Sequence, residues 1–286
     1  MSTKIPVVVF DTCVIRNIIH DDKTVLADWD SIFIYKNKTK FHISDIAIAE
    51  LALALLQNRI SFNDWERKIK KINKIIDCNM PILPSGNELS ALIENKRLSY
   101  PKVAGGQAYW KAVWKMFFEA KNFDTIKNGV IFKGDDGIEY KIKIDDNYAN
   151  SILESERITW NKYFESMRML FGGSNISEKD ILLILNEGMD KDVSTNPSQS
   201  QIYAPMLHAL ARLIHLYVYD VVPHYNPKSK KRRNDPLDYS LIQSLSLPAI
   251  ICTSDVRLKK MLSETKLNNI DTIILLSDLK KWLEKI

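Results

Sequence analysis

The feature of this 286-residue chain that most constrains its fold is a pair of short, continuous apolar runs, one near each end. Val7–Phe10 and Ala249–Cys252 contain no charged side chain, and both are rich in β-branched residues. Strands that are covered on both faces have this pattern, whereas strands with one face in water alternate apolar and polar residues. Because helical segments follow both runs, we expect an α/β fold, with a parallel sheet flanked by helices.

Further strands and helices complete the expected alternation. The additional strands are expected over Phe41–Ile43, Met80–Leu83 and Thr272–Leu276. Side chains that can cap a helix N-terminus indicate where helices begin. On this basis helices are expected from Ser44 to about Gln57, from Asn63 to about Ile76, over Met206–Val221, from Pro236 to about Leu245, over Asp255–Leu262 and, after a cap at Ser277, over Asp278–Lys285.

The stretch from 85 to 204 interrupts this alternation. It contains an apolar, largely aromatic stripe at helical spacing, formed by Trp110, Val113, Trp114 and Phe117. Val130–Ile144 alternates apolar and charged residues on its second half, after a Gly-Asp-Asp-Gly turn, which is typical of a hairpin. We therefore expect a mostly helical insertion with one β-hairpin, which divides the α/β domain into residues 1–84 and 205–286.

Composition excludes several classes of protein. With 45% hydrophobic and 26% charged residues, the chain has ordinary globular proportions. Its cysteines, Cys13, Cys78 and Cys252, have no CxxC spacing, so neither a disulfide framework nor a zinc ribbon is expected. No apolar run is long enough to span a bilayer, and the N-terminus lacks a signal-peptide pattern. We therefore expect no membrane partner and a cytoplasmic location.

Acidic residues follow both of the continuous apolar runs. Asp11 comes directly after the first run, and Asp255 follows the second after Thr253 and Ser254. In open parallel sheets, the carboxyl ends of the strands line the ligand crevice at the point where the strand order reverses. Neighbouring strands lie about 5 Å apart, so both acids would point into one crevice if these two strands are neighbours. For each acid alone, the structural alternative is a helix N-cap.

Glu50 is the only polar residue between Ile46 and Leu56. A helix that is apolar on all sides is buried, and a buried carboxylate needs a proton, a cationic partner or a metal ion. Glu50 is therefore a candidate for the same crevice. A structural ion pair is the alternative.

A basic run leads directly into a short acidic segment. Its cationic side chains are Lys228, Lys230, Lys231, Arg232 and Arg233. Such a run attracts a nucleic-acid backbone, although a solvated loop has the same composition. With Pro236 in the first turn of a helix, Asp235 is expected as its N-cap and Asp238 at N3, where the helix dipole favours an anion. The functional alternative places both acids beside the crevice.

Taken together, these segments resemble the PIN-domain nucleases. That family has an apolar strand ending in Asp, a buried helix carrying Glu, and two later acids. The segments that are similar to this pattern are Val7–Thr12, Ile43–Leu51, Asp238–Ile242 and Ile250–Asp255. The resemblance covers about 1–84 and 205–286 and implies a three-layer α/β/α arrangement. The insertion departs from the compact members of the family.

The resemblance implies a metal-dependent endonuclease acting on RNA, with DNA as the open alternative, and a role as a toxin or defence effector. It implies Mg²⁺ or Mn²⁺ as cofactor, held by the catalytic carboxylates Asp11, Glu50, Asp238 and Asp255. Asp235 is a further metal-ligand candidate, and Thr12, Thr253 and Ser254 are expected to position a ligand or phosphate. Beyond RNA, a second copy of the chain and a protein inhibitor or regulator are candidate partners.

The chemistry of these residues agrees with that expectation. Several carboxylates in one dry crevice raise one another's pKa unless cations neutralise them. Hard oxygen ligands in this number suit Mg²⁺ or Mn²⁺ rather than zinc. Such a metal orients a water for attack on a phosphodiester and stabilises the leaving oxygen.

Two rival functions remain open at this point. A phosphatase of the haloacid dehalogenase type also begins with a strand that ends in Asp, but it needs a second Asp where this chain has Cys13. A catalytically silent PIN-like module would keep the fold and bind RNA or a protein without cleaving. Retention of all four acids argues against the silent module.

Overall fold

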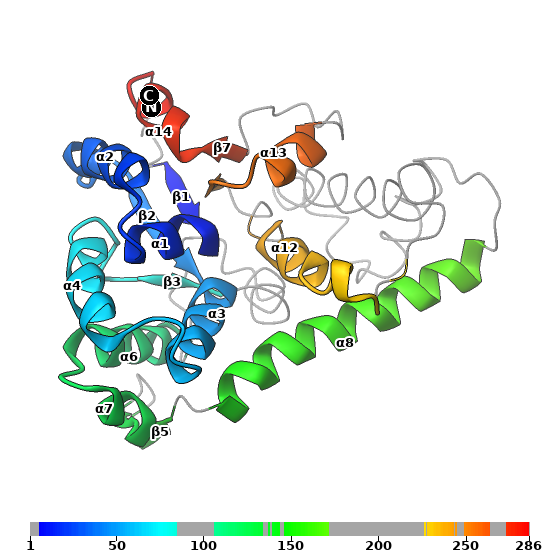
Figure 1. Cartoon of the computed structure of the whole chain (residues 1–286), viewed down its shortest axis with the longest axis horizontal. Helices are drawn as coiled ribbons and strands as arrows, with labels where there is room; N and C mark the ends of the chain where they lie inside the picture. Colours follow the sequence, from blue (N-terminus) through cyan, green and yellow to red (C-terminus); the bar gives the residue numbers. More distant parts are fainter. Residues whose placement is uncertain are drawn as a thin grey trace.

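The computed structural model describes residues 6–84, 106–133, 137, 139–143, 146–171, 226, 228–242, 244, 249–263 and 273–285. Within these residues a five-stranded parallel sheet has the order β3-β2-β1-β6-β7. Its strands are β1 Val7–Phe10, β2 Lys40–Ser44, β3 Ile82–Leu83, β6 Ala249–Thr253 and β7 Ile273–Leu275. Helices flank the sheet (Figure 1), which confirms the expected α/β class.

Strand β1 lies in the middle of this sheet. It pairs with β2 on one side and with β6 on the other, so that Phe10 stands opposite both Ile43 and Cys252. All residues of β1 and β6 are buried, as their continuous apolar character predicts. The two apolar runs are therefore neighbours in space, although almost the whole chain separates them in sequence.

Helices connect the strands and cover the sheet. The first part of the chain forms α1 Thr12–Ile19, α2 Lys23–Ile32, the 3-10 helix η1 Phe33–Tyr35, α3 Asp45–Leu56 and α4 Phe62–Asn73. The last part forms the 3-10 helix η3 Lys230–Arg232, α12 Asp235–Ile242, α13 Val256–Ser263 and α14 Leu276–Leu283. None of the described helices is long and apolar enough to cross a membrane. The expected helix over Met206–Val221 lies outside the described residues.

The described residues between 85 and 204 are largely helical and contain the expected hairpin. Their elements are α6 Gly106–Glu119, α7 Phe123–Asn128, the antiparallel strands β4 Val130–Lys133 and β5 Glu139–Ile142, and α8 Asp146–Phe171. Helix α6 packs against α4, where the Trp65 indole N–H donates to the Phe117 carbonyl at 3.3 Å. Helix α8 runs past α3 and α12 (Figure 1) and packs against both of them.

A cluster of aromatic rings forms the centre of the core beside β1. The ring centroid of Phe10 lies 4.8 Å from that of Trp29 on α2 and 5.6 Å from that of Phe41 on β2. All three side chains are fully buried. The same continuous core includes Trp114 and Phe117 of α6, so this helix shares its core with the sheet.

The helix starts agree only in part with expectation. Ser44 caps α3, since its Oγ accepts a hydrogen bond from the Ala47 amide at 3.1 Å. The expected cap at Asn63 is wrong. Helix α4 begins two residues earlier, because the Ser61 hydroxyl accepts from the Asp64 amide at 3.1 Å and donates to the Asp64 carboxylate at 2.6 Å.

Two expectations near strand ends also need correction. The expected cap at Ser277 is wrong, because β7 continues directly into α14 and Leu275 occupies the N-cap position without a side-chain hydrogen bond. The third strand is shorter than Met80–Leu83, since only its last two residues pair with β2.

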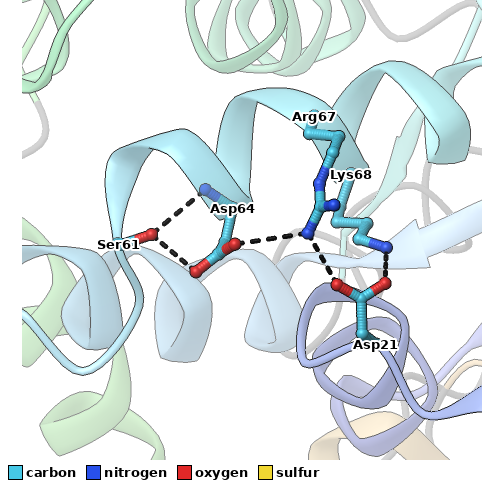
Figure 2. A network of polar contacts seen from close by, with 5 residues as sticks. All are labelled: Asp21, Ser61, Asp64, Arg67 and Lys68. Atoms are coloured by element: carbon cyan, nitrogen blue, oxygen red, sulfur yellow. Dashed lines mark hydrogen bonds and ion pairs between the residues drawn. The ribbon is translucent and has the colours of Figure 1, made fainter.

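An ion-pair network joins the α1–α2 connection to α4 (Figure 2). Asp21 binds the ammonium of Lys68 with one carboxylate oxygen and the guanidinium of Arg67, at 2.6 Å, with the other. The Lys68 side chain is only 8% exposed, so Asp21 neutralises a nearly buried cation. The hydrogen bond from Lys68, followed by the charges of Lys68 and Arg67, holds the pKa of Asp21 below its ordinary value despite some desolvation.

We expect Asp21→Asn to lower the melting temperature, because the nearly buried Lys68 loses its counter-ion. Asn tolerates the positive φ of 62° at this position, so the backbone can stay as it is. The difference in melting temperature between wild type and variant should be largest above the ordinary aspartate pKa of about 3.9. It should disappear as the pH falls through the lower pKa of Asp21 in the folded protein. Thermal melts from pH 2 to 8 measure it.

The matched control is Glu66→Gln, which removes an exposed partner of Lys70 four residues away on the same helix. Exposed pairs of this kind contribute about 0–1 kcal/mol, so this variant should melt close to the wild type. Equal melting temperatures for both variants would show that Asp21 is no more than a surface charge.

Candidate acidic site

The site begins where the strand order of the sheet reverses. Because β1 and β6 are neighbours, Asp11 and Asp255 follow adjacent strand ends, as the sequence predicts. The Asp11 amide donates to the Cys252 carbonyl at 3.0 Å and so continues the ladder beyond β1. In parallel α/β sheets this is the position at which ligands bind.

The Asp11 side chain does not serve as a helix cap. Asp11 occupies the N-cap position of α1, but its carboxylate accepts no hydrogen bond from the amides of that helix. Its Oδ2 instead accepts from the Thr253 hydroxyl at 2.7 Å and from the Cys13 thiol at 2.9 Å. The alternative that the Asp11 side chain serves only to cap α1 is therefore excluded.

Cys13 is a half-buried thiol beside that carboxylate. Burial, followed by the charge of Asp11 and the hydrogen bond to it, raises the pKa of Cys13 to about 12. The thiol thus keeps its proton at neutral pH and acts as a donor rather than as a nucleophile.

Asp255, in contrast, does cap a helix. Its Oδ1 accepts from the amides of Arg257 at 2.7 Å and Leu258 at 3.1 Å, at the start of α13. The neighbouring Ser254 has a buried hydroxyl oxygen with no hydrogen-bond partner among the described residues. Capping holds Asp255 in place and engages only one of its two carboxylate oxygens.

Glu50 enters the site from α3. Desolvation raises its pKa, and the nearby charge of Asp11 acts in the same direction. A hydrogen bond with Thr12 and the charges of Arg16 and Arg157 act in the opposite direction. Glu50 forms no ion pair with a described residue, so the alternative of a structural salt bridge finds no partner in this part of the chain.

Asp238 connects α12 to the same group of carboxylates. Its pKa lies well above the ordinary value, first because it is desolvated and then because Asp11, Asp235 and Asp255 are close. Arg257 opposes this shift from 3.6 Å. These effects indicate that Asp11, Asp235 and Asp255, which come from three separate segments, lie near enough to Asp238 for their charges to act on it.

Asp235 is almost completely buried and lies 3.7 Å from the guanidinium of Arg232. The expectation that it is the N-cap is wrong, since α12 already includes it. The amides of Leu237 and Asp238 both bond to the Asn234 carbonyl, which makes Asn234 the residue before the helix. The side chain of Asp235 still lies in the first turn of α12, where the helix dipole favours an acidic group.

The basic run lies directly beside this group. It forms the turn and the 3-10 helix η3 that lead into α12. Lys230 and Arg233 are exposed, Lys228 pairs with Glu165 of α8 at 2.9 Å, and Arg232 is engaged with Asp235. The side chain of Lys231 lies outside the described residues. Lys230 and Arg233 are therefore accessible from solvent, whereas Lys228 and Arg232 form ion pairs within the fold.

Sequence reasoning missed Arg157. It lies on α8, its Nε donates to the Arg233 carbonyl at 3.3 Å, and its charge lowers the pKa of Glu50. Its side chain is only 15% exposed. No local pattern marks this residue, since its place beside the acids comes from the packing of α8 on α3. Arg157 thus brings a positive charge from α8 to Glu50.

The donor chemistry of the site fits a hard divalent cation. Its candidate ligands are carboxylate oxygens. Desolvation, followed by the charges of neighbouring acids, raises the pKa values of Glu50 and Asp238, and a bound cation would oppose both effects. As the side chains stand, no three described His, Cys, Asp or Glu residues are grouped to hold one ion together. Arg232 and Arg257 contact Asp235 and Asp238 instead.

Comparison with models of known protein families, with curated proteins and with solved structures finds no match for this chain.

We expect Asp238→Asn to be more stable than the wild type at neutral and alkaline pH. Because the pKa of Asp238 is raised in the folded protein, wild-type stability falls as the pH rises from about 3.9 through the raised value. Each unit of elevation corresponds to about 1.4 kcal/mol, and the amide removes this penalty. Chemical denaturation from pH 4 to 9 measures the difference, with Glu119→Gln on the surface as the control. A stability difference that does not change with pH would contradict the raised pKa of Asp238.

Proposed function

We propose that this chain is a metal-dependent endonuclease of the PIN-like type that hydrolyses phosphodiester bonds in RNA. The observation that carries the proposal is the electrostatic coupling of Asp238 to Asp11, Asp235 and Asp255 at the point where the strand order reverses. Folded proteins seldom gather carboxylates that repel one another unless the charges serve a ligand. Glu50, whose pKa is raised in part by the charge of Asp11, adds a fifth carboxylate from a separate helix.

The residues that would hold Mg²⁺ or Mn²⁺ are the oxygen ligands of this group. They are Asp11, Glu50, Asp235, Asp238 and Asp255. When bound, such an ion activates a water and stabilises the leaving oxygen of a phosphodiester. Zinc is a poorer match, because the group contains no His and its nearest Cys has a raised pKa.

The remaining roles belong to the protein itself. Thr253 orients Asp11 through the hydrogen bond at 2.7 Å, and Asp255 is fixed by its contacts with α13. Arg157 and Arg257 bring positive charge to a site that would otherwise repel a phosphate. The exposed Lys230 and Arg233 lie at the entrance to α12, where they would attract the nucleic-acid backbone.

The alternative with specific support is a silent module that binds RNA without cleaving it. The arginine contacts of Asp235 and Asp238, together with the absence of a three-ligand group among the described side chains, favour this alternative. The phosphatase alternative is weaker, because Cys13 donates to Asp11 where that mechanism needs a second acid. Incubation of single-stranded RNA and DNA with the protein, in Mn²⁺ or in EDTA, separates nuclease from silent module.

Asp11→Asn should abolish metal-dependent cleavage and leave the fold intact, because it removes a ligand charge with little change in volume. A metal contributes several kcal/mol to charge stabilisation in the transition state, so the loss should be about 100-fold or more. Initial cleavage rates and a circular dichroism spectrum measure the two effects, with Glu119→Gln as an exposed control. Full activity of the variant, or of the wild type in EDTA, would refute the metal-dependent mechanism.

The basic run should govern binding more than turnover. Replacing Lys230 and Arg233 with Ala should weaken RNA binding and reduce the slope of affinity against salt by about 1–2, one for each lost phosphate contact. The measurement is a titration at several salt concentrations in an Asp11→Asn background, which prevents cleavage. The matched control replaces Lys111 and Lys121, two exposed lysines of the insertion. If both pairs change the slope equally, the run has no special role.

A further inference from the structure

The carboxylate of Asp11 is held on one side only. Its Oδ2 accepts two hydrogen bonds, from Thr253 Oγ1 at 2.7 Å and from Cys13 Sγ at 2.9 Å. Among the described residues, Oδ1 of Asp11 accepts none. Two donors on the same oxygen fix the rotation of the carboxylate and leave its other oxygen for a ligand.

Cys13 is itself tied to the end of β6. Its sulfur accepts a hydrogen bond from the Ser254 amide at 3.0 Å and lies 3.2 Å from the Thr253 hydroxyl. Thr253 Oγ1 in turn accepts from the Asp255 amide at 2.9 Å. The thiol and the hydroxyl each donate their one proton to Oδ2 of Asp11. Each also accepts a hydrogen bond from a backbone amide, Ser254 for the thiol and Asp255 for the hydroxyl.

The geometry points to Cys13 as a positioning residue of the acidic site. Together with Thr253, the Cys13 thiol holds Asp11 Oδ2, so that Oδ1 is free to bind the cation that the proposed nuclease function requires. This inference rests on the proposed function and adds a residue that the resemblance does not assign. Ligands of a metal are commonly oriented in this way by hydrogen bonds from residues that do not touch the ion.

The simpler alternative is that Cys13 only fills space. Cys252 offers an internal comparison, since it is also a buried thiol close to Asp11 but forms no side-chain hydrogen bond among the described residues. If the role of Cys13 is packing, truncation of either thiol should have the same kind of effect. If its role is donation, only Cys13 should influence the ion.

The test compares Cys13→Ala, Cys13→Ser and Cys252→Ala in the full chain. Titration of each variant with Mn²⁺ alone, followed by electron paramagnetic resonance, gives the affinity without reliance on cleavage. Removing an outer hydrogen-bond partner of a metal ligand weakens affinity about 10–100-fold, and we expect this loss for Cys13→Ala. Cys13→Ser keeps a donor and should retain most of the affinity. Cys252→Ala should lose stability but bind Mn²⁺ as the wild type does.

Melting temperatures of all variants keep the result interpretable, since affinities are compared well below the lowest transition. A further readout is the cleavage rate, which for Cys13→Ala should fall at low Mn²⁺ and recover in excess Mn²⁺. Wild-type affinity in Cys13→Ala, or an equal loss in Cys13→Ala and Cys13→Ser, would overturn the positioning role and leave the nuclease proposal standing. A wild-type chain that neither binds Mn²⁺ nor cleaves would refute the nuclease proposal itself.

Discussion

The parallel pairing of β1 with β6 is the constraint on which the rest of the structure depends. It joins residues near the two ends of the chain, with Phe10 opposite Cys252, and the Asp11 amide extends the ladder to the Cys252 carbonyl. Parallel pairing places both strand ends at the same edge, so the acids that follow them meet there. A one-residue shift in this register would reverse the side-chain directions of a strand and separate Asp11 from Thr253.

The site is also a balance between repulsion and compensation. Burial and neighbouring aspartates raise the pKa of Asp238, while Arg257 lowers it. Glu50 shows the same opposition between the charge of Asp11 and those of Arg16 and Arg157. Among the described residues, these arginines are the groups that oppose the repulsion.

The sequence was most informative where one physical cause dominates. Short continuous apolar runs rich in β-branched residues identify β1 and β6, because short strands covered on both faces have that pattern. Helix starts were less certain, since Ser61 and Asn63 are both good caps and only the contacts with Asp64 decide between them. Asp11 and Asp255 have the same place after a strand, yet only Asp255 caps its helix. Arg157 had no sequence signal, because its position follows from long-range packing.

Helix α8 supports the two helices that carry Glu50 and Asp238. Its Leu153 packs with Ile46 and Ala49 of α3 and with Leu237 of α12, which are the two helices that carry Glu50 and Asp238. Glu156 of α8 also accepts a hydrogen bond from Ser240 of α12. Helices α3 and α12 come from distant parts of the chain and contact each other directly, and α8 packs against both, so it helps to fix the distance between their carboxylates. The metal site proposed above would need that distance to be nearly constant, since ligand geometry must be held within a fraction of an ångström.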